Sequence, residues 1–173
     1  MFKETIYRKD KKSLDLKSPN IIFRNAVRAV IIKENKILMA HLEKTNEYKF
    51  PGGGKEENET RDAAIGREVL EEVGYEVERI KEKIGKIREY DTAEEGGDHI
   101  FKMVSEYYLV EVNKMPQKQK LEDYEKELLF KPCWIEIETA YETNMERIKN
   151  KDETTPGIRR ETKVLEIIKE IYK

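Results

Sequence analysis

Short apolar runs with branched side chains dominate the first third of the chain, and apolar positions at helical spacing follow it. The runs Val27 to Ile32 and Lys36 to His41 predict two strands, with Glu34-Asn35 as the turn between them. Thr5 to Arg8 and Ser13 to Lys17 predict two shorter strands around the polar segment KDKK. The first third is therefore predicted to be rich in β-structure.

The remainder alternates predicted strands with predicted helices. Apolar density predicts strands at residues 80–89 and 104–112 and a shorter one in CWIEI, residues 133–137. Helices are predicted at the following places: Thr60 to Val73 with Gly74 as C-terminal cap, Lys120 to Phe130, a segment capped by Thr139 and Glu142, and a last helix starting near Thr155-Pro156. We expect one stripe of the last helix to pack in the core: Val164, Leu165, Ile168, Ile171 and Tyr172.

The helix predicted at residues 60–73 brings three carboxylates together. At about 100° per residue, Glu71 and Glu72 lie within about 60° of Glu68 on either side. Another arc of the helix is expected to pack against a sheet, with its glycine allowing close approach: Ala63, Gly66, Val69, Leu70 and Val73. Three ionised carboxylates this close repel one another unless a positive charge neutralises them. Oxygen-only ligands suit Mg²⁺ or Mn²⁺.

A solvated surface face explains a glutamate-rich helix equally well, because 40% of the residues are charged. The glycines Gly52 to Gly54, just before the helix, favour the metal-site interpretation. Glycines at such a place let backbone groups approach a metal ion or a phosphate closely.

The spacing of glycines and charges over residues 53–75 resembles a known family signature. Its fixed positions read as follows: Gly53, Glu59, Arg67-Glu68, Val69, Glu71-Glu72 and Gly74. This is similar to the Nudix box of the MutT-like hydrolases, and the preceding YKFPGG resembles the segment that leads into it. Tyr75 departs from the pattern, which usually has an aliphatic residue there, and we expect it to alter local packing.

The resemblance implies an α/β Nudix fold with a mixed β-sheet between α-helices. It also implies divalent-metal-dependent hydrolysis of a nucleoside diphosphate linked to another group X. By position, Glu68, Glu71 and Glu72 would bind the metal, the Gly52 carbonyl would be a further ligand, and Glu68 would position or deprotonate water. A structural ion pair is expected between Glu59 and Arg67. Three later glutamates are candidates for one further ligand, with a solvated helix face as the alternative: Glu122, Glu125 and Glu127.

Substrate contacts are expected from residues near the box in the sequence. Arg28 and Lys44 are candidates for binding phosphate, although surface cations need no such role. Tyr90 lies near the place where dinucleoside-polyphosphate members carry a tyrosine. No short motif identifies X. A nucleotide-binding or sensing module without turnover is the alternative function, and an interaction protein that pairs through residues 5–17 is a third.

Composition limits the setting of this activity. With 173 residues and 20.5 kDa, we expect a single domain over 1–173, with residues 1–20 as an N-terminal strand extension. A formal charge of −2 gives no general attraction to nucleic-acid polymers. Cys133 is the single cysteine, and neither a signal peptide nor a membrane-spanning segment is evident. We therefore expect a cytoplasmic protein, monomeric or homodimeric, that acts on a small nucleotide derivative.

Overall fold

A computed structural model of the protein describes residues 1–8, 14, 20–92, 99–150 and 153–172. The described residues form these elements: β1 (Phe2–Tyr7), β2 (Ile21–Val30), β3 (Ile32–Lys33), β4 (Lys36–Leu42), β5 (Glu47–Lys49), α1 (Arg61–Val73), β6 (Val77–Thr92), β7 (Ile100–Val112), α2 (Asp123–Glu127), β8 (Phe130–Glu136), α3 (Ile137–Asn150) and α4 (Ile158–Ile171).

Two sheets form the centre of the molecule. The larger has the order β1-β6-β7-β2, in which β6 and β7 are antiparallel while β1 and β2 run parallel to their neighbours. The smaller is antiparallel and has β4 between β8 and β5, with β3 also paired to β4. The predicted mixed sheet is thus confirmed, and β1 is the first of the two predicted N-terminal strands. The other, Ser13 to Lys17, falls almost wholly outside the described residues.

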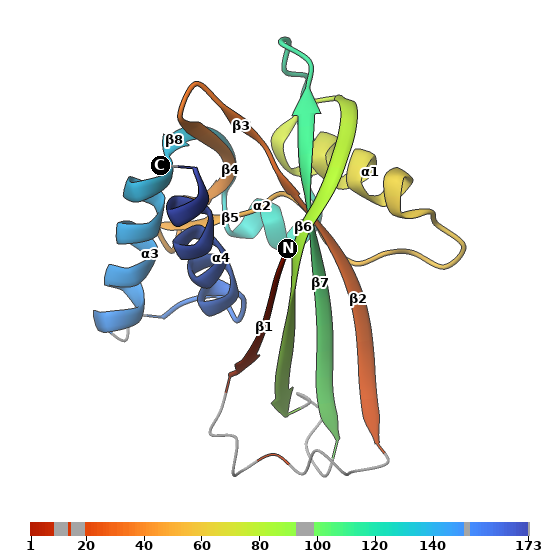
Figure 1. Cartoon of the computed structure of the whole chain (residues 1–173), viewed down its shortest axis with the longest axis vertical. Helices are drawn as coiled ribbons and strands as arrows, with labels where there is room; N and C mark the ends of the chain where they lie inside the picture. Colours follow the sequence, from red (N-terminus) through yellow and green to blue (C-terminus); the bar gives the residue numbers. More distant parts are fainter. Residues whose placement is uncertain (9–13, 15–19, 93–98, 151–152, 173) are drawn as a thin grey trace.

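Helices cover the sheets on opposite sides, α1 on one and α3 with α4 on the other (Figure 1). Because successive residues of a strand point to opposite faces, β2 contributes to both layers. Val27 and Ala29 pack in the cluster that includes Val69 of α1. Val30 packs in the cluster that includes Val164 of α4. The even-numbered residues of β2 therefore face the α4 side.

The C-terminal helices differ from the prediction at their ends. Lys120 to Phe130 is not one helix: α2 is short, Leu129 adopts φ 56°, and Phe130 begins β8. The predicted capping by Thr139 is wrong, because α3 already begins at Ile137, and Thr139 accepts a hydrogen bond from Thr143 inside it. The last helix begins at Ile158 with Gly157 as N-cap, so Pro156 lies outside it.

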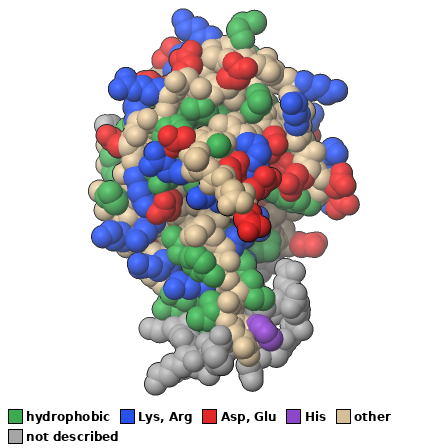
Figure 2. Space-filling model, turned by 90° about the vertical axis from the view of Figure 1, so that its right-hand side faces the viewer, with side chains coloured by type: hydrophobic (Ala, Val, Ile, Leu, Met, Phe, Trp, Pro, Cys, Tyr) green, Lys and Arg blue, Asp and Glu red, His purple; other side chains and the backbone are tan. Residues whose placement is uncertain are grey.

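The predicted apolar stripe of α4 is confirmed only in part. Val164, Leu165 and Ile168 are fully buried, but Ile171 is 60% exposed in the last turn. Other exposed apolar side chains occur at the start of β2, in Ile21, Ile22 and Phe23. Figure 2 shows the side of the molecule that is on the right in Figure 1, with hydrophobic side chains in its lower part, below a region of mixed charges. None of the helices in the described ranges is long and apolar enough to cross a membrane.

Candidate active site

Helix α1 has the ends that its sequence predicts. Thr60 is the N-cap, with its side chain accepting from the Ala63 N–H, and Gly74 is the C-cap with φ 74° and its N–H bonded to the Leu70 carbonyl. The buried face differs from the expected one. Ala63 is exposed and nothing lies within 4 Å of a Cβ placed on Gly66. The helix instead buries Ala64, Ile65, Glu68, Val69, Glu72 and Val73, so two box carboxylates lie on its inner face.

The glycine strap, residues Pro51 to Gly54, runs alongside β2. The N–H groups of Val27 and Ala29 donate to the carbonyls of Gly53 (3.0 Å) and Pro51 (2.8 Å). Gly52 has φ 141°, and a Cβ there would lie 2.1 Å from the Val27 carbonyl oxygen, so only glycine fits. The Gly52 N–H donates to Glu72 Oε2 at 2.8 Å. The strap thus places backbone groups against the box carboxylates.

Arg67 holds the box loop against the helix. Its Nε and Nη2 donate to the two oxygens of Glu59 at 2.9 and 3.0 Å, which is the ion pair expected from the sequence. Nη1 donates to Glu68 (2.9 Å) and to Glu71 (3.1 Å). The hydrogen bond with Glu59 raises the pKa of Arg67 and lowers the pKa of Glu59. Arg67 therefore remains charged and supplies a positive charge to two of the box carboxylates.

The buried carboxylates Glu68 and Glu72 have unfavourable surroundings for their charged forms. Glu68 is 8% exposed, and burial followed by repulsion from Glu72 raises its pKa. Burial also raises the pKa of Glu72, although Lys49 Nζ lies 2.7 Å from its Oε1. A further positive charge between these groups would stabilise both ionised forms. In the described ranges, no three His, Cys, Asp or Glu residues converge in a ready-made metal-binding group.

Glu125 is the one of the three later candidates that faces the box helix. Its charge also raises the pKa of Glu72, and its own side chain is 2% exposed. Its oxygens accept from the Glu122 N–H and the Tyr124 hydroxyl, both at 2.9 Å. Glu122 and Glu127 are exposed. Sequence reasoning named all three but had no means of choosing between them.

A cavity of about 510 Å³ opens beside the strap. Its lining includes Gly52, Gly53, Lys49 and Tyr124 at the carboxylate end, and Arg28 and Arg24 of β2 along the wall. Arg28 donates through Nη1 to the Gly52 carbonyl, the oxygen predicted to be a metal ligand. Other cavity residues come from elements distant in sequence: Arg8, Asp91, Phe101, Met103, Pro156, Gly157 and Arg160.

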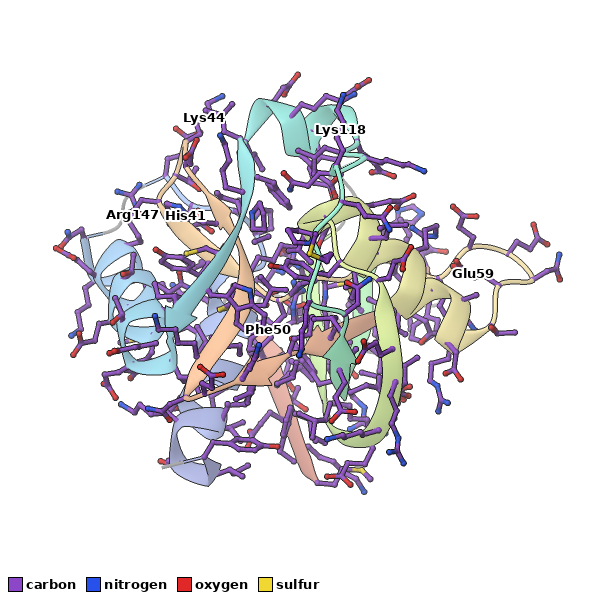
Figure 3. All side chains as sticks on the ribbon, turned by 90° about the horizontal axis from the view of Figure 1, so that it is seen from above. His41, Lys44, Phe50, Glu59, Lys118 and Arg147 are labelled. Atoms are coloured by element: carbon purple, nitrogen blue, oxygen red, sulfur yellow. The ribbon has the colours of Figure 1, made fainter. Side chains whose placement is uncertain are left out.

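Two sequence candidates lie elsewhere. Lys44 is exposed in the turn between β4 and β5, and Figure 3 shows it near His41, on the other side of the view from Glu59. Tyr90 stacks on Tyr7 with ring centroids 5.6 Å apart. Because side chains alternate along β6, Tyr90 lies on the sheet face opposite to that of Asp91. Neither Lys44 nor Tyr90 lines the cavity, and their substrate roles stay predictions.

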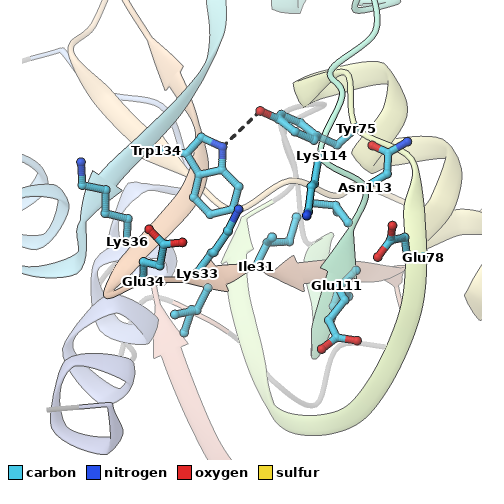
Figure 4. A pocket seen from close by; sticks show the side chains of 13 residues that line it. Ile31, Lys33, Glu34, Lys36, Tyr75, Glu78, Glu111, Asn113, Lys114 and Trp134 are labelled. Carbon is cyan, nitrogen blue, oxygen red and sulfur yellow. Dashed lines mark hydrogen bonds between the residues drawn. The ribbon is translucent and has the colours of Figure 1, made fainter.

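A second cavity, of about 520 Å³, lies where Tyr75 follows the box (Figure 4). Trp134 donates its indole N–H to the Tyr75 hydroxyl at 3.1 Å, and the two rings meet edge to face. Tyr75 thus makes a specific contact where an aliphatic residue is usual. The charged side chains around this cavity are of both signs: Lys33, Glu34, Lys36, Glu78, Glu111 and Lys114. No box carboxylate lines either cavity, and the strap residues Gly52 and Gly53 line only the first.

Comparisons with known proteins identify the family and the fold. The NUDIX domain family matches residues 22–156. The fold is similar to a MutT NUDIX hydrolase from Burkholderia pseudomallei, with a TM-score of 0.51 and 20% identity, covering 68% of this chain and 85% of that one. It is also similar to a NUDIX hydrolase from Nitrosomonas europaea, with a TM-score of 0.52 and 22% identity, covering 80% of this chain and 85% of that one. No curated protein matches the sequence.

The family match spans most of the chain. The fold, with two buried box glutamates beside a glycine strap, defines a NUDIX domain, and the chain belongs to this family as a Nudix hydrolase. Nudix hydrolases split pyrophosphate linkages in derivatives of nucleoside diphosphates, and they generally use divalent metal ions.

Proposed function

We propose that this chain uses Mg²⁺ or Mn²⁺ to hydrolyse the phosphoanhydride bond in a nucleoside diphosphate linked to another group X. One observation carries the proposal: the carboxylates of Glu68 and Glu72 are buried together beside the glycine strap, and the strap residues Gly52 and Gly53 line a cavity that also holds four arginines and Lys49. The cavity volume of about 510 Å³ is in the range of small-molecule sites.

The residues at this place fit a divalent cation. Glu68, Glu71 and Glu72 offer only oxygen donors, which Mg²⁺ and Mn²⁺ prefer. Burial raises the pKa of both Glu68 and Glu72 by more than the nearby charges of Arg67 and Lys49 lower it, so their ionised forms are destabilised. A bound cation would stabilise them. We propose these three glutamates as ligands, the Gly52 carbonyl as a further one once Arg28 releases it, and Glu125 as an additional carboxylate.

When bound, the ion polarises a phosphoryl oxygen and lowers the pKa of a water molecule. The chain supplies the remaining functions. We assign Glu68 to orienting that water or accepting its proton, because its carboxylate lies against Gly53, where a Cβ would come within 2.3 Å of it. Arg28 contributes a guanidinium group for a substrate phosphate. Arg67, paired with Glu59, also donates to the Gly54 carbonyl and so holds the strap against helix α1.

The sensing alternative differs only in turnover. It would retain the cavity and the nucleotide but lack effective hydrolysis. The loss of a box glutamate or of Gly53 would favour this alternative. None is lost, since Gly53, Glu68, Glu71 and Glu72 are all present. The single cysteine, Cys133, which excludes an internal disulfide, supports a reducing compartment such as the cytoplasm.

A substrate panel tests the proposal. It contains nucleoside triphosphates, oxidised ones included, ADP-ribose, nucleotide sugars and dinucleoside polyphosphates, each incubated with Mg²⁺, with Mn²⁺ and with EDTA. We expect product release from at least one compound in the presence of either metal and none in EDTA. Silence across the panel from folded protein that binds a nucleotide would favour the sensing alternative.

A further inference from the structure

Two residues on neighbouring strands of the larger sheet, Arg24 and Met103, line the candidate active-site cavity. Arg24 of β2 pairs in register with Met103 of β7, which pairs in register with Glu89 of β6. In-register partners on neighbouring strands point to the same face of a sheet, and adjacent strands are about 4.8 Å apart. We call Arg24, Met103 and Glu89 the Arg24 row. Along β2 this row lies two residues after Ile22, whose row includes Phe101 and Asp91, and four residues before Arg28, which pairs with Tyr107.

The carboxylate in this row is already neutralised. Glu89 is 1% exposed and accepts from Arg8 Nε at 3.1 Å and from Arg160 Nη1. Arg160 in turn pairs with Glu161 at 2.6 Å. Arg24 is different. In the described parts of the chain no carboxylate forms an ion pair with it or with Arg28. Neither guanidinium on this cavity wall is therefore held in an ion pair by a described carboxylate, although the charge of Arg28 lowers the pKa of buried Glu161.

Both arginines lie against the strap. Arg28 donates to the Gly52 carbonyl, and the guanidinium of Arg24 lies beside Gly54, where a Cβ would come within 2.8 Å of its Nε. Arg28 is 5% exposed, and among the described residues its Nε has no hydrogen-bond partner. Arg28 and Arg24 thus lie against Gly52 and Gly54, two residues or about 7 Å apart on the strap, while their own backbones are four residues or about 13 Å apart on β2. This spacing along the strap suits a chain of phosphates better than a single one.

The N-terminus of α4 closes the same cavity. Pro156, Gly157 and Arg160 line it, and the N-cap residue Gly157 offers no side-chain cap. A helix N-terminus carries partial positive charge and backbone N–H groups. Together with the unpartnered Nε of buried Arg28 in the same cavity, this end of the helix adds to a field that favours extra negative charge on the ligand.

We propose that Arg24 forms a second anion subsite, which binds a phosphate beyond the two of the hydrolysed linkage. The inference rests on the proposed function and narrows it: preferred substrates carry three or more phosphates in line, so that X is itself phosphorylated. Nucleotide sugars and ADP-ribose, in which X lacks a phosphate of its own, are weaker substrates. Arg24 was not among the residues that sequence patterns singled out.

A series of diadenosine polyphosphates tests the proposal, because X changes from adenosine to AMP to ADP as the chain grows from two to four phosphates. We expect kcat/KM to rise by about tenfold or more between two and four phosphates, as for a charge-assisted hydrogen bond. In Arg24→Gln this ratio should fall by about tenfold. Arg79→Gln, an exposed arginine on β6 outside the cavity, should keep the wild-type ratio. An unchanged ratio in Arg24→Gln would overturn the proposal.

A binding measurement separates this outcome from failure of the proposed function. Calorimetry with inorganic tripolyphosphate in EDTA needs neither metal nor turnover. We expect Arg24→Gln to weaken the affinity by about tenfold and Arg79→Gln to leave it unchanged. Hydrolysis that is absent throughout the series, with the Arg24 dependence of binding intact, would reject the enzyme and keep the subsite. Equal affinity in wild type and Arg24→Gln would reject the subsite.

Discussion

Gly53 lies directly against the carboxylate of Glu68. The carboxylate can occupy its position only because residue 53 has no side chain. A Cβ at position 53 would meet Glu68 Oε1 at 2.3 Å. The carboxylate is the end of a flexible side chain and can move, so Gly53→Ala is expected to fold. Because a displacement of about 1 Å costs about 100-fold in rate, we expect Gly53→Ala to lower kcat by about that factor. Steady-state kinetics and a urea unfolding curve measure the two effects.

Gly66→Ala is the matched control within the same helix. Nothing lies within 4 Å of its added Cβ, and alanine is the better helix former. We expect this variant to gain about 0.5–1 kcal/mol in free energy of unfolding and to keep wild-type activity. Equal activity of the Gly53 and Gly66 variants would contradict the role given to Gly53.

The sequence predicted the contacts of individual residues correctly where those contacts depend on spacing along one helix and its preceding loop. The Arg67–Glu59 pair followed from the box pattern, and so did the grouping of Glu68 and Glu72 on one helix face. Glu125 and Arg24 acquire their places only through tertiary packing. Arg24 belongs to the cavity because β2 pairs with β7 and the strap, and no local pattern marks this arginine.

Helix α4 is the element that secures the strap. Glu161, 2% exposed, accepts from the Phe50 N–H at 3.1 Å, just before Pro51 and Gly52. One helical residue earlier, Arg160 reaches Glu89 of β6. Burial alone would raise the pKa of Glu161, but the charges of Arg160 and Arg28 outweigh it and lower the pKa. The helix thus couples the strap to the larger sheet through a buried ion pair.

This coupling predicts a pH-dependent stability. A carboxylate whose pKa is lowered on folding stabilises the native state above its unfolded pKa, about 4.3, and loses that contribution as pH falls through the folded pKa. We expect Glu161→Gln to cost about 3–5 kcal/mol in free energy of unfolding at pH 7. The difference from wild type should stay constant down to about pH 5 and shrink below pH 4. Urea unfolding at several pH values measures it.

The surface pair of Lys163 with Glu166, also in α4, provides the control. Both side chains are 40% exposed at a separation of 2.6 Å. Glu166→Gln should change stability by at most about 1 kcal/mol. A loss in Glu161→Gln no larger than in Glu166→Gln would show that the buried pair does not hold the strap.

The bounds of helices and strands were predicted most closely where capping or turn residues in the local sequence mark the end of the element. Helix α1 has both caps in its own sequence, and the turn at Glu34-Asn35 has positive φ at both residues, as a type I′ hairpin turn requires. The region around α2 gave no such signal, because pairing with β4 draws Phe130 into β8. Tertiary pairing overrode local helical pattern there.

At the scale of the whole molecule, the candidate active site lies where two sheets and two helical layers meet. Its groups come from positions as distant as Arg8 and Arg160, which converge on Glu89. Such convergence cannot be read from spacing. The buried carboxylates of α1 lie in this centre, so a cation bound to them should stabilise the entire fold.

Metal binding should therefore raise the melting temperature. At a metal concentration of about 100 times Kd, the gain is about 2.7 kcal/mol, or about 5–10 °C for a domain of this size. Differential scanning fluorimetry with Mg²⁺ or Mn²⁺ against EDTA measures the shift. Glu72→Gln should lose most of it, and Glu57→Gln, an exposed loop glutamate, should retain it. A wild-type midpoint that neither metal moves would argue strongly against the metal site.

The most direct test of the central claim is the turnover of Glu68→Gln on the best substrate of the panel, measured with saturating Mg²⁺ or Mn²⁺ beside wild type and Glu57→Gln. Our account predicts a loss of about 100-fold or more in Glu68→Gln, with its fold intact by circular dichroism, and full activity in Glu57→Gln. Undiminished turnover in a folded Glu68→Gln would contradict the assignment of this carboxylate cluster as the catalytic centre.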